Sequence, residues 1–239
     1  MNIWGKVIGG AAGFAIGGPI GALLGAVAGH AIDTKILPSY ISNDENYKSI
    51  VFTAGVIALS AKMAKADGKV TKEEILTFRK LVQIPKDDIN QVSKLWELAK
   101  ETTDGYELYA KQIFSLFSNQ PEILERILDI LFEIAKSDGN IDSTELNYLK
   151  NVSNIFNFDE IIFKKLLALH NPENNSFEIL GVKISDSLED IQKKWKEMVK
   201  NNHPDKLVGQ GMPIEFIESA NQKLAIINSA FEEIKSLRT

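Results

Sequence analysis

Residues 202–206 read NHPDK, and this short stretch decides how the C-terminal part of the chain is organised. Asn202 and Pro204 on either side of His203 indicate a turn between helices rather than a position in a core. The turn follows a predicted amphipathic helix over residues 188–199 and precedes another helix from about residue 214 to residue 237. The helix before the turn has an apolar face, Leu188, Ile191, Trp195, Met198 and Val199, and an opposite basic face, Lys193, Lys196 and Lys200.

The order of motifs around this turn resembles the J-domain over nearly all of its length. FEILGV at residues 177–182 comes first, then the basic helix, the HPDK turn, and QKLAIINSAFEEIK at residues 222–235. The resemblance implies a helical hairpin that binds a DnaK-class chaperone and stimulates ATP hydrolysis by that partner. It also implies a partner-binding set made of His203, Pro204, Asp205, Lys193, Lys196, Lys200 and Trp195.

The middle of the chain, residues 45–170, has the pattern of successive amphipathic helices without a competing strand pattern. Two stretches within it match, AKADGKVTKEE at residues 64–74 and AKSDGNIDSTE at residues 135–145. A duplicated helix-turn-helix unit is the simplest account of this repeat. The clearest predicted helix starts at Pro121 and has apolar residues at helical spacing: Ile123, Leu124, Ile127, Leu128, Leu131 and Ile134.

The acidic residues of the repeat have two explanations. Thr71 with Glu74, and Asp142 with Glu145, have the spacing of a helix N-cap and its capping box, and this explanation is favoured. A weaker metal site between the two copies stays open. An EF-hand is excluded, because the positions that need oxygen ligands hold Met63, Lys65, Ile134 and Lys136. The weak metal candidates are Asp67, Glu74, Asp138, Asp142 and Glu145.

The paired AKxDG and Glu motifs resemble the helical domain of tellurite-resistance TerB proteins. This resemblance implies a small helical bundle and adds little chemistry.

The N-terminal part contains an uncharged run, residues 7–32, which is longer than the ~20 residues that a helix needs to cross a bilayer. It predicts a membrane segment that contacts lipid, and the run is too long for the apolar core of a signal peptide. Pro19 leaves open whether the segment spans once with a kink or forms a hairpin. Glycines recur along one helical face and predict either self-association of the anchor or simple low complexity: Gly9, Gly13, Gly17, Gly21, Gly25 and Gly29.

Composition excludes several classes of function. A net charge of -5 argues against a nucleic-acid partner, which calls for a basic surface. The chain has no cysteine, so disulfides, thiolate metal sites and cysteine nucleophiles are excluded. The sequence contains no phosphate-binding Gly-Lys-Ser/Thr loop, and no nucleophile lies near His203 in the sequence. We therefore expect that the protein is not an enzyme and needs no cofactor.

The whole pattern resembles the DjlA type of membrane-anchored DnaJ-like co-chaperone: a WGK start, GHAID after the uncharged run, the TerB-like middle and HPDKLVGQGMP near the end. It implies an all-α chain with a membrane anchor and its flanks in residues 1–40, a TerB-like bundle in residues 41–170 and a J-domain in residues 171–239. It also implies one pass through a bacterial inner membrane, with the later domains in the cytoplasm. The competing hypothesis is a membrane stress or scaffold protein whose TerB-like domain binds a metal or a partner, with the J-domain secondary.

Overall fold

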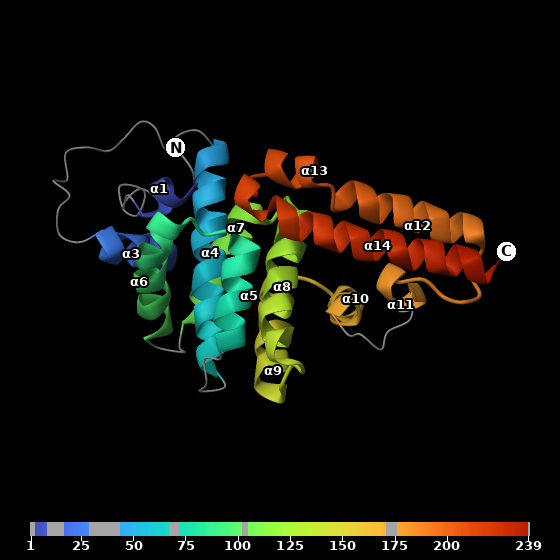
Figure 1. Ribbon diagram of the computed structural model, residues 1–239, viewed down its shortest axis with the longest axis horizontal. Helices are drawn as coiled ribbons and strands as arrows, with labels where there is room; N and C mark the ends of the chain where they lie inside the picture. The colour runs from blue at the N-terminus through green and yellow to red at the C-terminus, as the bar shows by residue number, and fades with distance from the viewer. Residues whose placement is uncertain are drawn as a thin grey trace.

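Figure 1 shows the computed structural model of the chain, which describes residues 3–8, 17–28, 44–66, 72–101, 105–170 and 176–238. Every regular element in these ranges is helical and none is a strand, which confirms the predicted all-α fold. The α-helices are α1 (Ile3–Ile8), α3 (Gly18–Ala28), α4 (Asp44–Ala66), α5 (Lys72–Val82), α6 (Ile89–Lys100), α7 (Tyr106–Phe117), α8 (Pro121–Ala135), α9 (Ser143–Ile155), α10 (Glu160–His170), α11 (Ser176–Leu180), α12 (Leu188–Asn201), α13 (Pro204–Gly209) and α14 (Ile217–Leu237). Short 3-10 turns are η2 (Lys86–Asp88), η3 (Lys136–Asp138) and η4 (Ile214–Phe216).

Helix α4 forms the centre of a bundle, and helices α6, α7, α8 and α9 pack around it. Nearly every side chain of α4 from residue 50 to residue 64 is buried, as expected for a helix that neighbours cover on all sides. Gly55 belongs to this packing, because an added Cβ would lie 2.6 Å from Ile113 Cδ1 of α7.

Helix α8 confirms the apolar pattern predicted after Pro121, which occupies the first turn of the helix. All six residues of that pattern are buried: Ile123, Leu124, Ile127, Leu128, Leu131 and Ile134. The same helix also buries two charged residues, Arg126 and Asp129, each only 1% exposed. Buried charges require partners, and these come from the C-terminal part of the chain.

The uncharged N-terminal run is not one continuous helix in the described residues. Gly17 and Gly18 have left-handed φ angles of 63° and 61°, and helix α3 starts at Gly18. Gln112 of α7 fixes this start, because its side-chain oxygen accepts the Ile20 N–H at 3.0 Å and its amide donates to the Gly17 carbonyl at 2.9 Å. Across the ranges that the structure describes, no helix is both long and apolar enough to span a bilayer.

The glycine stripe is only partly within the described residues. Gly9, Gly13 and Gly29 lie outside them. Gly17 precedes α3 and is exposed, whereas Gly21 is buried and Gly25 is half-buried within the helix. Large apolar side chains of α1 and α3 are buried in the core of the bundle: Ile3, Trp4, Val7, Ile20, Leu23 and Leu24.

Helices α11 to α14 form a hairpin that extends sideways from the bundle, with α12 and α14 side by side (Figure 1). We call residues 176–238 the C-terminal hairpin. Its outer end has a small core of its own, formed by Leu180, Ile191, Met198, Ile227, Ala230, Phe231 and Ile234. Its inner end shares the core of the bundle through Leu207, Met212, Phe216 and Ala220.

Charged residues of α8 meet the hairpin along α14. Lys223 of α14 is 4% exposed, and its Nζ lies 3.2 Å from Glu125 Oε1 and 3.4 Å from Asp129 Oδ2. Arg126 pairs with Asp129 and donates to the Ser219 hydroxyl of α14, and His170 Nε2 lies 2.8 Å from Asp129 Oδ1. We call Glu125, Arg126, Asp129, His170, Ser219 and Lys223 the junction cluster.

The junction cluster keeps its carboxylates ionised. Burial by itself would raise the pKa of Asp129, but the charges of Lys223 and Arg126 outweigh burial and hold that pKa well below its usual range. The carboxyl group of Glu125 is affected in the same way. Burial alone would raise its pKa, but Lys223 and Lys165 lower that pKa overall. The hairpin is therefore attached to the bundle by a charged contact inside a shared apolar core.

Candidate partner-binding site

The site predicted from the sequence is the turn between α12 and α13. Ser187 begins α12 as its N-cap, because its hydroxyl accepts the Asp190 N–H at 3.1 Å. Asn202 ends the helix: its side-chain amide donates to the Met198 carbonyl at 2.8 Å, and its backbone N–H donates to the same oxygen at 3.0 Å. The turn therefore starts from a fixed position.

His203 is the N-cap of α13. Its Nδ1 accepts the backbone N–H of Asp205 at 3.2 Å, and Pro204 fills the first helical position, where no N–H is needed. Since Nδ1 is an acceptor, the proton of the neutral ring is on Nε2, which is left as a donor. The ring is thus oriented by its own backbone.

The two polar residues of the turn are exposed while Pro204 between them is buried. The side chain of His203 is 51% exposed and that of Asp205 is 92% exposed. A buried proline under two exposed polar groups makes a rigid platform, because the proline ring fixes φ and its packing fixes the turn. Chemically, the turn presents a hydrogen-bond donor and a charged acceptor to a partner.

The basic face of α12 is exposed at Lys193, Lys196 and Lys200, on the same helix that leads into the turn. Trp195 is located differently from these lysines. Its ring stacks on Phe231 of α14 with centroids 4.4 Å apart, and its Nε1 donates to Asn228 Oδ1 at 2.9 Å. Trp195 therefore packs the hairpin and presents the helix, while the three lysines face solvent.

Two of the metal candidates that the structure describes, Asp142 and Glu145, form a helix cap. Asp142 Oδ1 accepts the backbone N–H groups of Thr144 and Glu145 at 2.6 and 2.8 Å, and Glu145 Oε2 accepts the Asp142 N–H at 2.9 Å. This is the complete capping box predicted for the second repeat. Within the described ranges no three acidic or histidine side chains gather as metal ligands, and Asp138 is exposed. Asp67 and the side chain of Glu74 are outside the described part.

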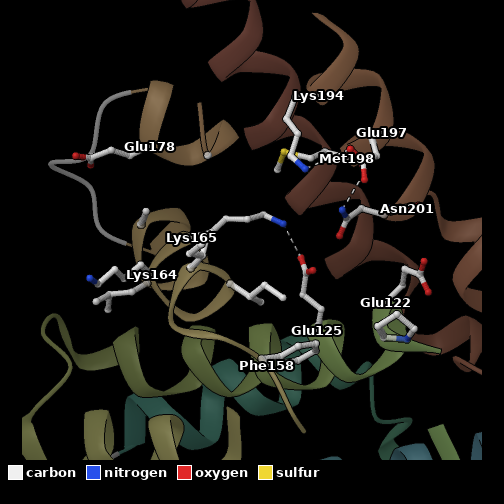
Figure 2. Close-up of a pocket in the computed structure, with 17 residues that line it drawn as sticks. Glu122, Glu125, Phe158, Lys164, Lys165, Glu178, Lys194, Glu197, Met198 and Asn201 are labelled. Atoms are coloured by element: carbon white, nitrogen blue, oxygen red, sulfur yellow. Dashed lines mark hydrogen bonds and ion pairs between the residues drawn. The ribbon is translucent and has the colours of Figure 1, made fainter. Parts of the chain in front are cut away.

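A groove of about 710 Å³ separates the bundle from the hairpin, between α8, α10, α11 and α12. Figure 2 shows the charged side chains that line it, with Lys165 of α10 reaching Glu125 of α8 at 3.1 Å. Beside the groove, Lys206 Nζ lies 2.9 Å from Glu122 Oε1, so the residue next to Asp205 is joined to helix α8. Burial alone would raise the pKa of Glu122, but its contacts with Lys206 lower that pKa overall.

The contact between Glu122 and Lys206, the residue that follows Asp205, was not predicted from the sequence. Lys206 belongs to the HPDK motif, but 84 positions of the chain separate it from Glu122. Residues 123–134 carry four charged side chains within the apolar pattern, Glu125, Arg126, Asp129 and Glu133. Charges that become buried require partners from elsewhere in the fold, but this pattern does not indicate Lys206 as the partner of Glu122.

Comparison with known proteins finds similarity along the chain from its N-terminal segment to its C-terminal hairpin. Residues 1–57 match the family model of the co-chaperone DjlA transmembrane domain, and residues 53–168 match that of the tellurite resistance protein TerB. The chain is similar over nearly its whole length to proteins named co-chaperone protein DjlA. It is 24% identical to that of Pasteurella multocida, with 98% of both chains aligned, and 26% identical to that of Coxiella burnetii, with 100% of this chain and 99% of the relative aligned.

No solved structure is significantly similar to the chain. The two family models follow one another along residues 1–168, in the order that the sequence predicted, and the relatives continue the match through the hairpin. From its N-terminal segment through the hairpin, the chain is therefore similar to the DjlA co-chaperones.

Proposed function

We propose that the C-terminal hairpin is a J-domain that stimulates ATP hydrolysis by a DnaK-class chaperone through His203, Pro204 and Asp205. The observation that carries the proposal is the exposure of His203 and Asp205 on a capped turn directly after the exposed basic face of α12. The hydrolysis takes place in the partner, in agreement with the prediction that the chain is not an enzyme. Similarity to proteins named co-chaperone protein DjlA supports this division.

The two parts of the site have different roles in the proposed function. Lys193, Lys196 and Lys200 steer the hairpin to an acidic surface of the partner, an effect that acts on association and is screened by salt. His203 and Asp205 then bind one conformational state of the partner better than the other, which is the only way in which a bound protein can shift that equilibrium. Trp195 supports both parts by packing α12 on α14.

We also propose that the N-terminal part anchors the protein in a bacterial inner membrane, by a single pass through residues 7–32, with the bundle and the hairpin in the cytoplasm. The match to the DjlA transmembrane domain over residues 1–57 supports the anchor. Ile20 and Leu24 are buried against the bundle in the described conformation, so insertion exchanges these contacts for lipid. The proposed division of the chain is residues 1–40, 41–170 and 171–239. Self-association through the glycine stripe stays a prediction.

The test of the proposed function is single-turnover ATP hydrolysis by a DnaK-class chaperone at saturating concentrations of the full chain. We expect His203→Gln to abolish stimulation, because Gln cannot reproduce both the Nδ1 cap and the outward Nε2–H of the ring. Asp205→Asn should do likewise, because the neutral amide loses the charge at almost the same shape.

Lys196→Ala provides the contrast. Its loss should raise the co-chaperone concentration needed for half-maximal stimulation, by an amount that shrinks at high salt, and leave the maximum unchanged. Full stimulation by His203→Gln, with a wild-type circular-dichroism spectrum, would defeat the proposal.

A further inference from the structure

We propose that Glu122, on helix α8 of the bundle, is a positioning residue for the His203–Asp205 turn of the hairpin. The inference rests on the proposed function, because it names the part of the bundle that controls how the same site is presented. The Glu122 carboxylate does not touch the turn itself and acts through the residues on either side of it.

Lys206 joins those two sides. Its Nζ lies 2.9 Å from Glu122 Oε1 and 2.8 Å from Asn201 Oδ1, so one ammonium group links the bundle to the last residue of α12. The other carboxylate oxygen of Glu122 accepts the side-chain amide of Gln210 at 3.4 Å. A single carboxylate thus holds residues that precede and follow the turn.

The ion pair between Lys206 and Glu122 is partly buried. The side chain of Lys206 is 31% exposed and that of Glu122 is 21% exposed, so water screens their attraction less than it screens an ordinary surface pair. Asn201 Oδ1 adds a second acceptor for the Lys206 ammonium, which restricts the lysine to one geometry.

The backbone after α13 is fixed to the bundle as well. Gly211 has a left-handed φ of 110°, and an added Cβ would lie 2.6 Å from Lys48 Cβ of helix α4. Its carbonyl accepts the Ser49 hydroxyl at 3.0 Å. Met212 follows in the shared core. The segment after the turn is therefore anchored at Gly211, and Glu122 provides the anchor nearest to His203 and Asp205.

The position of Glu122 on α8 supports the same conclusion. Glu122, Glu125 and Asp129 lie at helical spacing on α8 and each pairs with a lysine of the hairpin, the first with Lys206 and the other two with Lys223. This row runs along the junction. The Asp129 end is buried and contacts α14, whereas the Glu122 end is half-buried and contacts Lys206, the residue that follows the turn.

The effect should appear in the maximal stimulation rather than in association. A turn that leaves its orientation part of the time lowers the fraction of complexes able to act, while Lys193, Lys196 and Lys200 still bring the partners together. In the full chain in detergent micelles, we expect Glu122→Gln to lower the maximal single-turnover rate of the DnaK-class ATPase about two- to fivefold, the range of a partly exposed ion pair. The concentration for half-maximal stimulation should change less.

Two further variants make the measurement specific. The exchange Glu122→Lys with Lys206→Glu restores opposite charges and should recover most of the maximum. Glu160→Gln is the matched control, because it removes another carboxylate of the bundle whose ion-pair partner, Lys150 at 3.6 Å, also belongs to the bundle. It should leave both kinetic parameters unchanged.

Hydrogen exchange of the backbone amides of residues 205–210 separates this inference from the proposed function. Faster exchange there in Glu122→Gln supports the positioning role even if the wild-type chain does not stimulate a DnaK-class chaperone, an outcome that refutes the proposed function alone. Unchanged exchange, an unchanged or higher maximum in Glu122→Gln, or failure of the charge exchange to restore the maximum would each overturn the inference.

Discussion

The two ends of the C-terminal hairpin are built differently. The outer end closes on itself: Ile191, Ile227 and Phe231 form a small core that contains no residue of the bundle among those described. The inner end has no separate core, because Leu207, Met212 and Phe216 are buried together with residues of the bundle. The proposed site lies at the inner end, where α12 meets α13 (Figure 1).

This difference shows why the site need not be flexible to be exposed. His203 and Asp205 project into solvent, but the residues that follow them are fixed by the shared core and by the charged row of α8. A rigid base under exposed polar groups favours a defined geometry of contact, since little orientation is left to be lost on binding.

The largest effect on stability should come from replacing a buried phenylalanine of the hairpin, in one variant at its inner end and in a second variant at its outer end. Phe216 is fully buried and meets Phe52 of α4 edge to face, with ring centroids 4.9 Å apart. Phe216→Ala should cost about 3–5 kcal/mol and lower the stability of bundle and hairpin together. Phe231→Ala removes the stacking partner of Trp195 and should loosen the outer end while the bundle keeps its stability. Native-state hydrogen exchange resolves the two regions, and equal losses in the bundle for both variants would contradict the comparison.

The junction cluster is the next contact to break. Asp129→Asn keeps the shape but leaves Arg126 and Lys223 buried with less negative charge, so we expect a loss of about 3 kcal/mol in the free energy of unfolding. Urea unfolding followed by tryptophan fluorescence measures it. A neutral result would mean that the charged contact is dispensable for holding the two regions together.

The same residue predicts a pH dependence. The pKa of Asp129 is lower in the folded state than its ordinary value of 3.8, so the unfolded chain binds more protons in the acid range and stability rises with pH there. The contribution of Asp129 is fully present above this ordinary value and is lost as the pH falls through the lower folded pKa. The stability difference between wild type and Asp129→Asn should therefore be constant near neutral pH and shrink on acidification. Glu133 acts in the opposite direction, because burial raises its pKa.

The sequence predicted the features that depend on near neighbours along the chain. The helical periodicity of residues 123–134, the turn at His203 and the Asp142 cap are local patterns, and the structure confirms the helix and the cap. The contact between Lys206 and Glu122 and the sharing of one core by Met212 and α4 depend on how distant helices pack, which periodicity cannot indicate. The sequence left open whether residues 7–32 span once or form a hairpin. Composition could not decide it, because a glycine stripe and a glycine turn, such as the left-handed Gly17 and Gly18, have the same composition.

The smallest predicted effect serves as the reference for the others. Asp142 caps α9 through two backbone N–H groups, on a side of the bundle where no contact with the hairpin is among those described. Asp142→Ala should cost about 1 kcal/mol, as N-cap losses typically do, and should leave amide exchange at residues 203–210 unchanged. Thermal melts with and without calcium test the alternative role of this carboxylate, because a bound ion would raise the melting temperature of the wild type but not of the variant. A calcium-dependent rise of this kind would contradict the capping explanation, since both Asp142 and Glu145 are occupied by backbone N–H groups in the box and a metal would have to displace them.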